Sequence, residues 1–325
     1  MQRRRFISIL ATSAAGLSLS RVAAAATPAP LQPVTWRGYS LGAEGSFTLY
    51  TQNPTGAQQV LQLCFTEIRR LEAVFSLYNS QSELSRLNRD GQLKNPSTDW
   101  APLCAAISQA HRLTDGGFDP TIQPLWQAYA AHFATHPAAT TGPTAATLAA
   151  ARAQTGWQHV EYEARAIHFA RPGIQLTLNG IAQGYITDRV SEILQDAGYK
   201  NVLVELGETR ALGPHPEQRP WSIGIKHPEQ PTQVERVIEL NNQALATSGG
   251  YGSPFSKDGK FHHLIDPRSG RPSNRWSSLS VVAPTATQAD ALSTGLSFAS
   301  AEQIRHIEHS QPELRIWAQS AAAPA

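Results

Sequence analysis

The chain has 325 residues, with 27 Lys and Arg against 25 Asp and Glu, and a formal net charge of +2. Four of the arginines lie in the first 26 residues, which contain no acid, so residues 27–325 have 23 basic and 25 acidic residues and a net charge of −2. This balance, without a basic stripe, gives no basis for nucleic-acid binding, while 41% hydrophobic and 16% charged residues indicate a compact globular protein.

The N-terminal segment has the pattern of an export signal. Gln2-Arg3-Arg4-Arg5-Phe6-Ile7 is typical of a twin-arginine start, and an apolar run follows through Leu19. This run is too short and too rich in Ser and Ala for a stable membrane span, and Ala23–Ala26 offers a cleavage site. We expect a twin-arginine signal peptide over residues 1–26, periplasmic localisation, and a Pro-rich tether over residues 27–35.

Hydrophobic periodicity predicts the elements of one large unit over residues 36–316, followed by a flexible tail over residues 317–325. The first half contains a predicted hairpin over 36–50 and predicted helices over 57–75, 99–113, 125–133 and 143–153. The second half contains predicted strands over 160–162, 166–169, 175–178, 201–206, 221–225, 234–240, 244–247, 262–265 and 278–282, and predicted helices over 181–197, 288–298 and 301–308. Runs of strands broken by few helices favour an α+β fold with largely antiparallel sheets.

The two cysteines, Cys64 and Cys104, lie on apolar faces of predicted helices. Buried free thiols are typical of such positions, whereas export would also permit a disulfide. Both alternatives remain open from the sequence.

A predicted strand runs into a predicted helix through small residues, over Leu176–Tyr185. Gly180 allows a ligand to approach the backbone closely, and the free N–H groups at the start of a helix attract phosphate. An ordinary strand–helix turn has the same pattern, so this segment alone does not define a site.

The predicted helix near the C-terminus carries two side chains whose oxygen atoms suit a hard cation. Asp290 and Thr294 are four residues apart, which places them on one helix face, one turn from each other. Mg²⁺ prefers few protein oxygens together with waters and phosphates. The alternative is an acid in the first turn of a helix and a surface hydroxyl.

Two further segments carry polar groups in turns. His263 precedes the turn Asp266-Pro267-Arg268-Ser269-Gly270 and is a candidate general base or phosphate contact, or a structural histidine. Ser248 belongs to the Gly-rich segment Ala246–Tyr251, whose hydroxyls and amides suit phosphate oxygens or form a plain turn.

Residues 36–310 resemble the ApbE family of FAD:protein FMN transferases, and these motifs occur along the chain in the family order. His263–Gly270 matches the family pattern H-[ILV]-I-D-P-R-[ST]-G, and Ala289–Thr294 matches A-D-A-L-x-T without a break. Two upstream segments, Ser76–Asn88 with Tyr78 and Gly117–Thr121 with Asp119, match further family patterns.

The chain departs from the family pattern D-L-G-G-I-A-K-G-Y. Thr177 replaces its Asp, Asn179 replaces its first Gly and Gln183 replaces its Lys, while Gly180 is kept. Gln183 can form hydrogen bonds but cannot neutralise charge. Upstream, Leu41 stands where the family has Met.

The resemblance implies an ApbE-like, T-fold-related α+β unit and an enzyme that cleaves FAD, attaches FMN to a Ser or Thr of a target protein and releases AMP. It implies Mg²⁺ held by Asp290, Thr294 and the Gly180 carbonyl, with His263 as the catalytic residue. The FAD contacts it implies are Leu41, Tyr78, Gly117, Phe118, Asp119, Thr177, Gln183, Ser248 and Leu264.

The same resemblance implies an acceptor protein with a Ser/Thr flavinylation site, a subunit of a periplasmic-facing membrane redox complex. The leader and the Thr-Leu-Asn-Gly-Ile-Ala-Gln-Gly variant are similar to the NosX-like branch of the family. Two alternatives share the same residues: an FAD pyrophosphatase without an acceptor, and a non-catalytic periplasmic flavin-binding or delivery protein.

Overall fold

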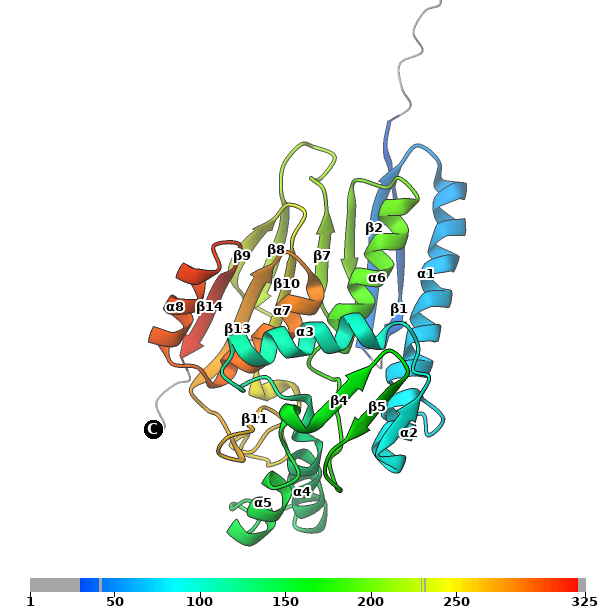
Figure 1. The fold of residues 1–325 in the computed structure, drawn as a ribbon. Coiled ribbons are helices and arrows are strands. Elements are labelled where there is room, and N and C mark those ends of the chain that lie inside the picture. Colours follow the sequence, from blue (N-terminus) through cyan, green and yellow to red (C-terminus); the bar gives the residue numbers. More distant parts are fainter. Residues whose placement is uncertain (1–29, 41–42, 229, 231, 321–325) are drawn as a thin grey trace, which may run out of the picture. The chain divides into compact units, whose positions relative to one another are not determined.

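The computed structural model describes residues 30–40, 43–228, 230 and 232–320, and its centre is a seven-stranded antiparallel sheet (Figure 1). The expected signal peptide and Leu41 lie outside the described residues. Every pairing in the sheet is antiparallel, as the sequence predicts. Its strands in spatial order are β1 (Gln32–Ser40), β2 (Ala43–Thr51), β6 (Val202–Glu205), β7 (Thr209–Leu212), β10 (Ala244–Ser248), β13 (Trp276–Ala283) and β14 (Arg315–Ser320).

Eight α-helices occur among the described residues, and several of them cover one face of this sheet (Figure 1). None of the helices in the described part of the chain is both long and apolar enough to cross a membrane. The helices are α1 (Pro54–Phe75), α2 (Glu83–Asp90), α3 (Trp100–Leu113), α4 (Gln123–Thr135), α5 (Ala145–Arg152), α6 (Ala182–Asp196), α7 (Ala286–Gly295) and α8 (Ala301–Ser310).

The other face of the central sheet is covered by the hairpin of β8 (Trp221–Lys226) and β9 (Val234–Leu240). Successive side chains of a strand point to opposite faces of the sheet, so each strand contributes to both cores. Ala246 and Val281 belong to the core under the helices, and Leu245 belongs to the core under the hairpin. Burial on both faces therefore explains why β10 and β13 are apolar over consecutive residues.

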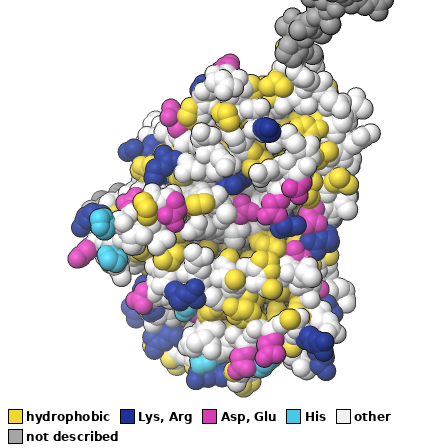
Figure 2. All heavy atoms as spheres, turned by 45° about the horizontal axis from the view of Figure 1, so that its top comes forward, with side chains coloured by type: hydrophobic (Ala, Val, Ile, Leu, Met, Phe, Trp, Pro, Cys, Tyr) yellow, Lys and Arg dark blue, Asp and Glu magenta, His cyan; other side chains and the backbone are white. Residues whose placement is uncertain are grey.

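Smaller elements complete the described part of the chain. Helices α4 and α5 pack around their own small core, which includes Leu125, Tyr129 and Phe133. The surface shown in Figure 2 has acidic and basic side chains interspersed, with hydrophobic patches between them. The remaining elements are strands β3 (Gln92–Lys94), β4 (Val160–Glu163), β5 (Ala166–Phe169), β11 (Ile265–Asp266) and β12 (Arg271–Pro272), and 3-10 helices η1 (Pro120–Ile122), η2 (Trp157–His159), η3 (Gly250–Gly252) and η4 (Leu296–Phe298).

Two predicted strands differ from the structure. Residues 175–178 form no strand, because the Asn88 side chain takes the place of a neighbouring strand: its Oδ1 accepts from the Leu176 N–H (2.7 Å) and its Nδ2 donates to the Leu176 carbonyl (2.8 Å). The strand predicted over 262–265 is reduced to β11, which pairs with β12 across the Pro267–Gly270 turn. Both segments are thus irregular backbone beside the candidate site.

The ends of the fold also differ from the expected boundaries. β1 begins at Gln32, inside the segment expected to be a tether, and β14 continues to Ser320, beyond the expected end at residue 316. Each of these edge strands gains its hydrogen bonds from one neighbouring strand, which periodicity within a single segment does not reveal.

Candidate functional site

The expected site residues come together around one pocket of about 320 Å³. Its walls come from loops and helix starts that are far apart in the sequence, at the end of the central sheet where α6 begins. Every expected site residue that the structure describes lines it: Tyr78, Gly117, Phe118, Asp119, Thr177, Gly180, Gln183, Ser248, His263, Leu264, Asp290 and Thr294.

Asp290, Thr294 and Gly180, the expected metal ligands, all line the pocket. A methyl group on Gly180 would lie 2.8 Å from Oγ1 of Thr294, so the backbone of the 178–181 turn directly contacts α7. Asp290, one turn earlier on α7, is 4% exposed and accepts a hydrogen bond from the Gly184 N–H (3.0 Å). Helix α7 therefore presents the Thr294 hydroxyl beside the Gly180 backbone and the Asp290 carboxylate one turn away, against Gly184.

Glu208 lines the same pocket and was not among the expected site residues. Burial, followed by repulsion from Asp290, raises the pKa of Glu208 well above its usual value. Burial likewise raises the pKa of Asp290 to about 7; the Gly184 N–H opposes this and Asp188 adds to it. The sequence did contain a signal for Glu208, because it ends the loop Leu206-Gly207-Glu208 between β6 and β7.

This donor set fits a hard divalent cation. A carboxylate, a hydroxyl and a backbone carbonyl are ligands that Mg²⁺ accepts. The raised pKa values of the neighbouring acids Asp290 and Glu208 indicate that no positive charge lies beside them to stabilise their ionised forms. The described residues contain no cluster of three or more His, Cys, Asp and Glu suited to a metal ion. A cation at Asp290 would therefore depend on Thr294 and the Gly180 carbonyl for its other protein ligands.

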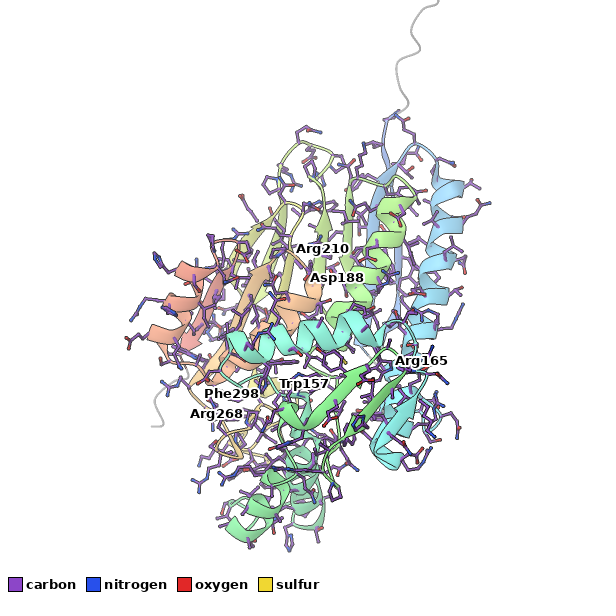
Figure 3. The ribbon with its side chains drawn as sticks, in the orientation of Figure 1. Trp157, Arg165, Asp188, Arg210, Arg268 and Phe298 are labelled. Carbon is purple, nitrogen blue, oxygen red and sulfur yellow. The ribbon has the colours of Figure 1, made fainter. Side chains whose placement is uncertain are left out.

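Helices α6 and α7 bind each other's first turns. Asp290 of α7 accepts from Gly184 of α6, and Asp188 of α6 accepts from the N–H groups of Ala286 and Thr287 (2.8 Å each) at the start of α7. Figure 3 shows Asp188 close to Arg210 of β7, and their nearest charged atoms are 4.0 Å apart. These reciprocal contacts fix the register of the two helices that carry the site.

His263 and His262 differ in what their rings contact. His262 accepts from the Leu264 N–H at Nδ1 (3.3 Å) and pairs with Asn274 through Nε2 (3.1 Å), which makes it structural. His263 lines the pocket, and its Nδ1 is buried without a hydrogen-bond partner in the described residues. Burial and then the neighbouring His262 lower the pKa of His263 to about 4, so its ring is neutral at physiological pH.

Hydroxyl groups beside Thr294 also line the pocket. Ser248, the last residue of β10, pairs with Oγ of Ser293 (2.8 Å) and with Oγ1 of Thr294 (3.3 Å). Thr247, next to it, pairs with Ser280 of β13 (2.7 Å) and also lines the pocket. These hydroxyls are suited to hydrogen bonding with phosphate oxygens.

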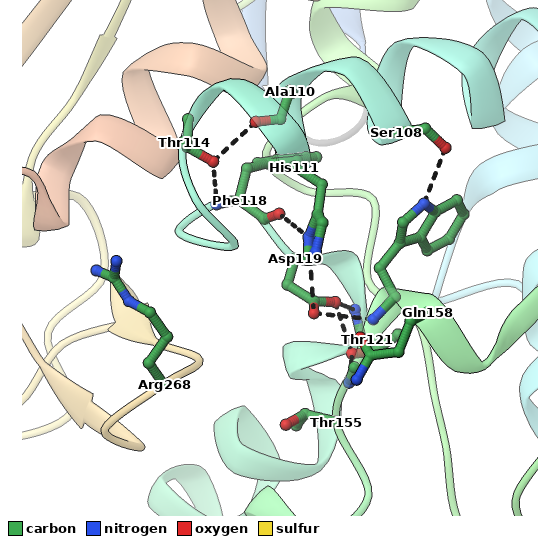
Figure 4. A network of polar contacts seen from close by, with 12 residues as sticks. Ser108, Ala110, His111, Thr114, Phe118, Asp119, Thr121, Thr155, Gln158 and Arg268 are labelled. Carbon is green, nitrogen blue, oxygen red and sulfur yellow. Dashed lines mark hydrogen bonds and ion pairs between the residues drawn. The ribbon is translucent and has the colours of Figure 1, made fainter. Parts of the chain in front are cut away.

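Asp119 belongs to a buried network that holds one wall of the pocket (Figure 4). Its Oδ1 accepts from the N–H and hydroxyl of Thr121 (2.9 and 2.6 Å), and its Oδ2 accepts from the Trp157 N–H (2.9 Å). The contacts found for this carboxylate are thus all within the protein, and they hold Phe118 and Gly117 in place. A direct hydrogen bond between Asp119 and a dinucleotide stays a prediction.

The pocket also opens beside Tyr78 and Gln183. Tyr78 is 90% exposed, unlike a core aromatic, and its ring is free to stack on a planar ligand. A neighbouring pocket of about 670 Å³ shares both of these residues and His263 with the first. The two pockets therefore form a continuous binding region, within the size range of small-molecule sites.

Fold and site together place this chain in the structural class of the flavin transferases. A solved structure of the flavin transferase ApbE from Vibrio cholerae matches it with a TM-score of 0.76 and 27% identity, covering 90% of this chain and 98% of that one. The ApbE family model matches residues 41–317, and the chain belongs to the ApbE family.

Two relatives agree with this assignment. The FAD:protein FMN transferase of Haemophilus influenzae is 35% identical over 70% of this chain and 69% of its own length. That of Vibrio cholerae is 34% identical over 82% of this chain and 81% of its own.

Proposed function

We propose that this chain is an exported, Mg²⁺-dependent FAD:protein FMN transferase, which cleaves FAD, attaches FMN to a Ser or Thr of a periplasmic redox protein and releases AMP. The observation that carries the proposal is the convergence of Gly180, Asp290, Thr294, Ser248 and His263 on one pocket, in a chain whose relatives bear that name. Export rests on the twin-arginine pattern of residues 1–26, which lie outside the described structure.

The reaction is a substitution at phosphorus. The acceptor hydroxyl oxygen forms a bond to the FMN phosphorus, the bond from that phosphorus to the bridging oxygen breaks, and AMP leaves with the bridging oxygen. The hydroxyl proton passes to His263, whose neutral ring can accept it. Positioning of the two reactants in one pocket supplies much of the rate.

Asp290, Thr294 and the Gly180 carbonyl would hold the magnesium ion. When bound there, it would neutralise negative charge on the pyrophosphate oxygens. The hydroxyls of Ser248 and Thr247 orient the phosphates, and Tyr78 offers a ring to the flavin or adenine. Gln183 contributes a hydrogen-bonding amide rather than a charge.

Incubation of the mature protein with FAD, Mg²⁺ and an acceptor domain tests the proposal. Transfer adds the mass of FMN to the acceptor and releases AMP. Release of FMN without an acceptor adduct would instead make the protein an FAD pyrophosphatase. Intact FAD would make it a binding or delivery protein.

The metal assignment has its own test. Asp290→Ala removes the one buried carboxylate among the expected ligands, so we expect Mg²⁺ affinity and transfer to fall by about 100-fold or more. Calorimetric titration with Mg²⁺ and acceptor mass measure the two effects. Asp90→Ala, at the exposed end of α2, is the control, and transfer by Asp290→Ala at the wild-type rate would exclude this metal site.

A further inference from the structure

The pocket proposed to receive the FAD pyrophosphate has acids but no fixed cation. Among the described residues that line it, Asp119, Glu208 and Asp290 are acids and none is a lysine or an arginine. Asp119 is engaged within the protein, so Glu208 and Asp290 are the acids that face a ligand. Pyrophosphate is itself negative, so it meets no opposite charge in this lining, and any ionisation of the two acids adds repulsion.

The helix N-terminus beside the pocket offers little compensation. Helix α6 begins at Ala182 without a side-chain cap, which would leave a partial positive charge for an anion. Asp290 already lies against this turn through the Gly184 N–H, so its carboxylate uses part of that charge.

Gln183 occupies the place where a cation would change this balance. Its amide nitrogen is 2.7 Å from the point that a methyl group on Gly207 would occupy, so the side chain ends beside the Gly207–Glu208 turn. The ApbE pattern has a lysine at this position, which would place a positive charge beside the Gly207–Glu208 turn. The amide of Gln183 supplies hydrogen bonds but no positive charge there.

We propose that Gln183 makes FAD binding by this chain conditional on a divalent cation, so that the protein takes up FAD together with the metal and discriminates against free FAD. The inference rests on the proposed function, because it assumes that FAD is the ligand and that Asp290 and Thr294 bind the metal. Linkage requires that the metal raise FAD affinity by the factor by which FAD raises metal affinity.

Equilibrium binding of FAD to the mature protein, followed by flavin fluorescence, tests this without an acceptor. We expect the wild type to bind FAD about 100-fold more tightly in Mg²⁺ than in EDTA. Gln183→Lys should reduce this ratio to below about 10-fold, by raising affinity in EDTA. Gln183→Met, which has similar length and no charge, should keep the wild-type ratio. Chromatography of the mixture verifies that FAD is intact.

Three further variants keep the test decisive if Gln183→Lys does not fold. Glu208→Gln removes one of the two acids that face the ligand and should also lower the ratio. Arg89→Gln, at the exposed end of α2 and outside both pockets, should leave it unchanged. Arg69→Gln tests the arginine that lines the neighbouring pocket. A large loss of metal-free binding in Arg69→Gln would overturn the inference by identifying a cation that already serves FAD.

The inference and the proposed function fail in different ways. Equal FAD affinity in Mg²⁺ and EDTA for the wild type, or an unchanged ratio in both Gln183→Lys and Glu208→Gln, overturns the role of Gln183 even if FMN transfer occurs. Metal-dependent FAD binding without an acceptor adduct overturns the transferase assignment and leaves the binding inference standing.

Discussion

At the residue scale, Asp290 has two roles: it accepts a hydrogen bond from the first turn of α6, and it lines the pocket. Burial of its carboxylate, with a smaller contribution from Asp188, raises its pKa from the usual 3.8 to about 7. A group with a raised pKa in the folded state stabilises the fold below its unfolded pKa, and this contribution is lost as pH rises through the folded pKa. In the metal-free protein, the contribution of Asp290 to the free energy of unfolding therefore decreases as pH rises from about 4 to about 7.

This gives a prediction for Asp290→Asn in EDTA. The variant should become progressively more stable than the wild type as pH rises from about 4 to about 7, and the difference should shrink when Mg²⁺ is added. Urea unfolding at a series of pH values measures it. A stability difference independent of pH would show that Asp290 is charged throughout in the folded protein.

The comparison with a variant is needed because His263 acts in the opposite direction. Its pKa is lowered to about 4, so its contribution is present above pH 6.5 and is lost as pH falls toward 4. The wild-type curve alone mixes the two groups, whereas Asp290→Asn removes only one of them.

At the scale of elements, the contact between α6 and α7 decides the site geometry. A methyl group on Gly184 would lie 2.4 Å from the Ala286 carbonyl oxygen and 2.9 Å from Cβ of Asp290. Only glycine allows the helices to approach this closely.

Gly184→Ala should therefore destabilise the protein by roughly 1–3 kcal/mol, although alanine is the better helix former. It should also weaken Mg²⁺ binding, because α7 must move away from Gly180. Urea unfolding and Mg²⁺ titration check both effects. Gly56→Ala in α1, whose methyl would first meet the end of the Asn53 side chain rather than a backbone atom, is the matched control. Equal stability of the two variants would contradict the close packing.

Asp188 makes the reciprocal contact, with three hydrogen bonds to the first turn of α7. Asp188→Ala removes these and should cost about 1–2 kcal/mol of unfolding free energy, since it leaves two N–H groups without their acceptor. Denaturant unfolding measures the loss, with Asp196→Ala at the exposed end of α6 as the reference. We would abandon the capping role if both variants were equally stable.

At the scale of the whole molecule, the two cysteines are free and buried in the main core. Cys64 belongs to α1 and Cys104 to α3, and burial raises the pKa of each thiol to about 12. Free, buried thiols are thus the alternative that the structure supports.

The thiols should consequently be unreactive toward a disulfide reagent such as dithionitrobenzoate in the native protein, and both should react after unfolding in denaturant. Absorbance of the released thiolate counts them. A protein that shows no reactive thiol even when unfolded without reductant would contain a disulfide.

Much of the site was predictable from sequence because its motifs are local. The spacing of Asp290 and Thr294, the Gly180 turn and the His263 segment each define chemistry within a few residues. Glu208 and Asp188 were missed as site-related residues because their importance lies in partners more than 80 residues away, Asp290 and the start of α7.

By itself, the sequence determined the α+β class, the long helices, the family and the candidate ligands, since these depend on periodicity and on short motifs. Tertiary structure decided what those residues face: that Asn88 rather than a strand pairs with Leu176, that Asp119 is engaged within the protein, and that Glu208 faces Asp290. Burial, close approach and uncompensated charge arise only when distant segments meet, and a local pattern contains none of them.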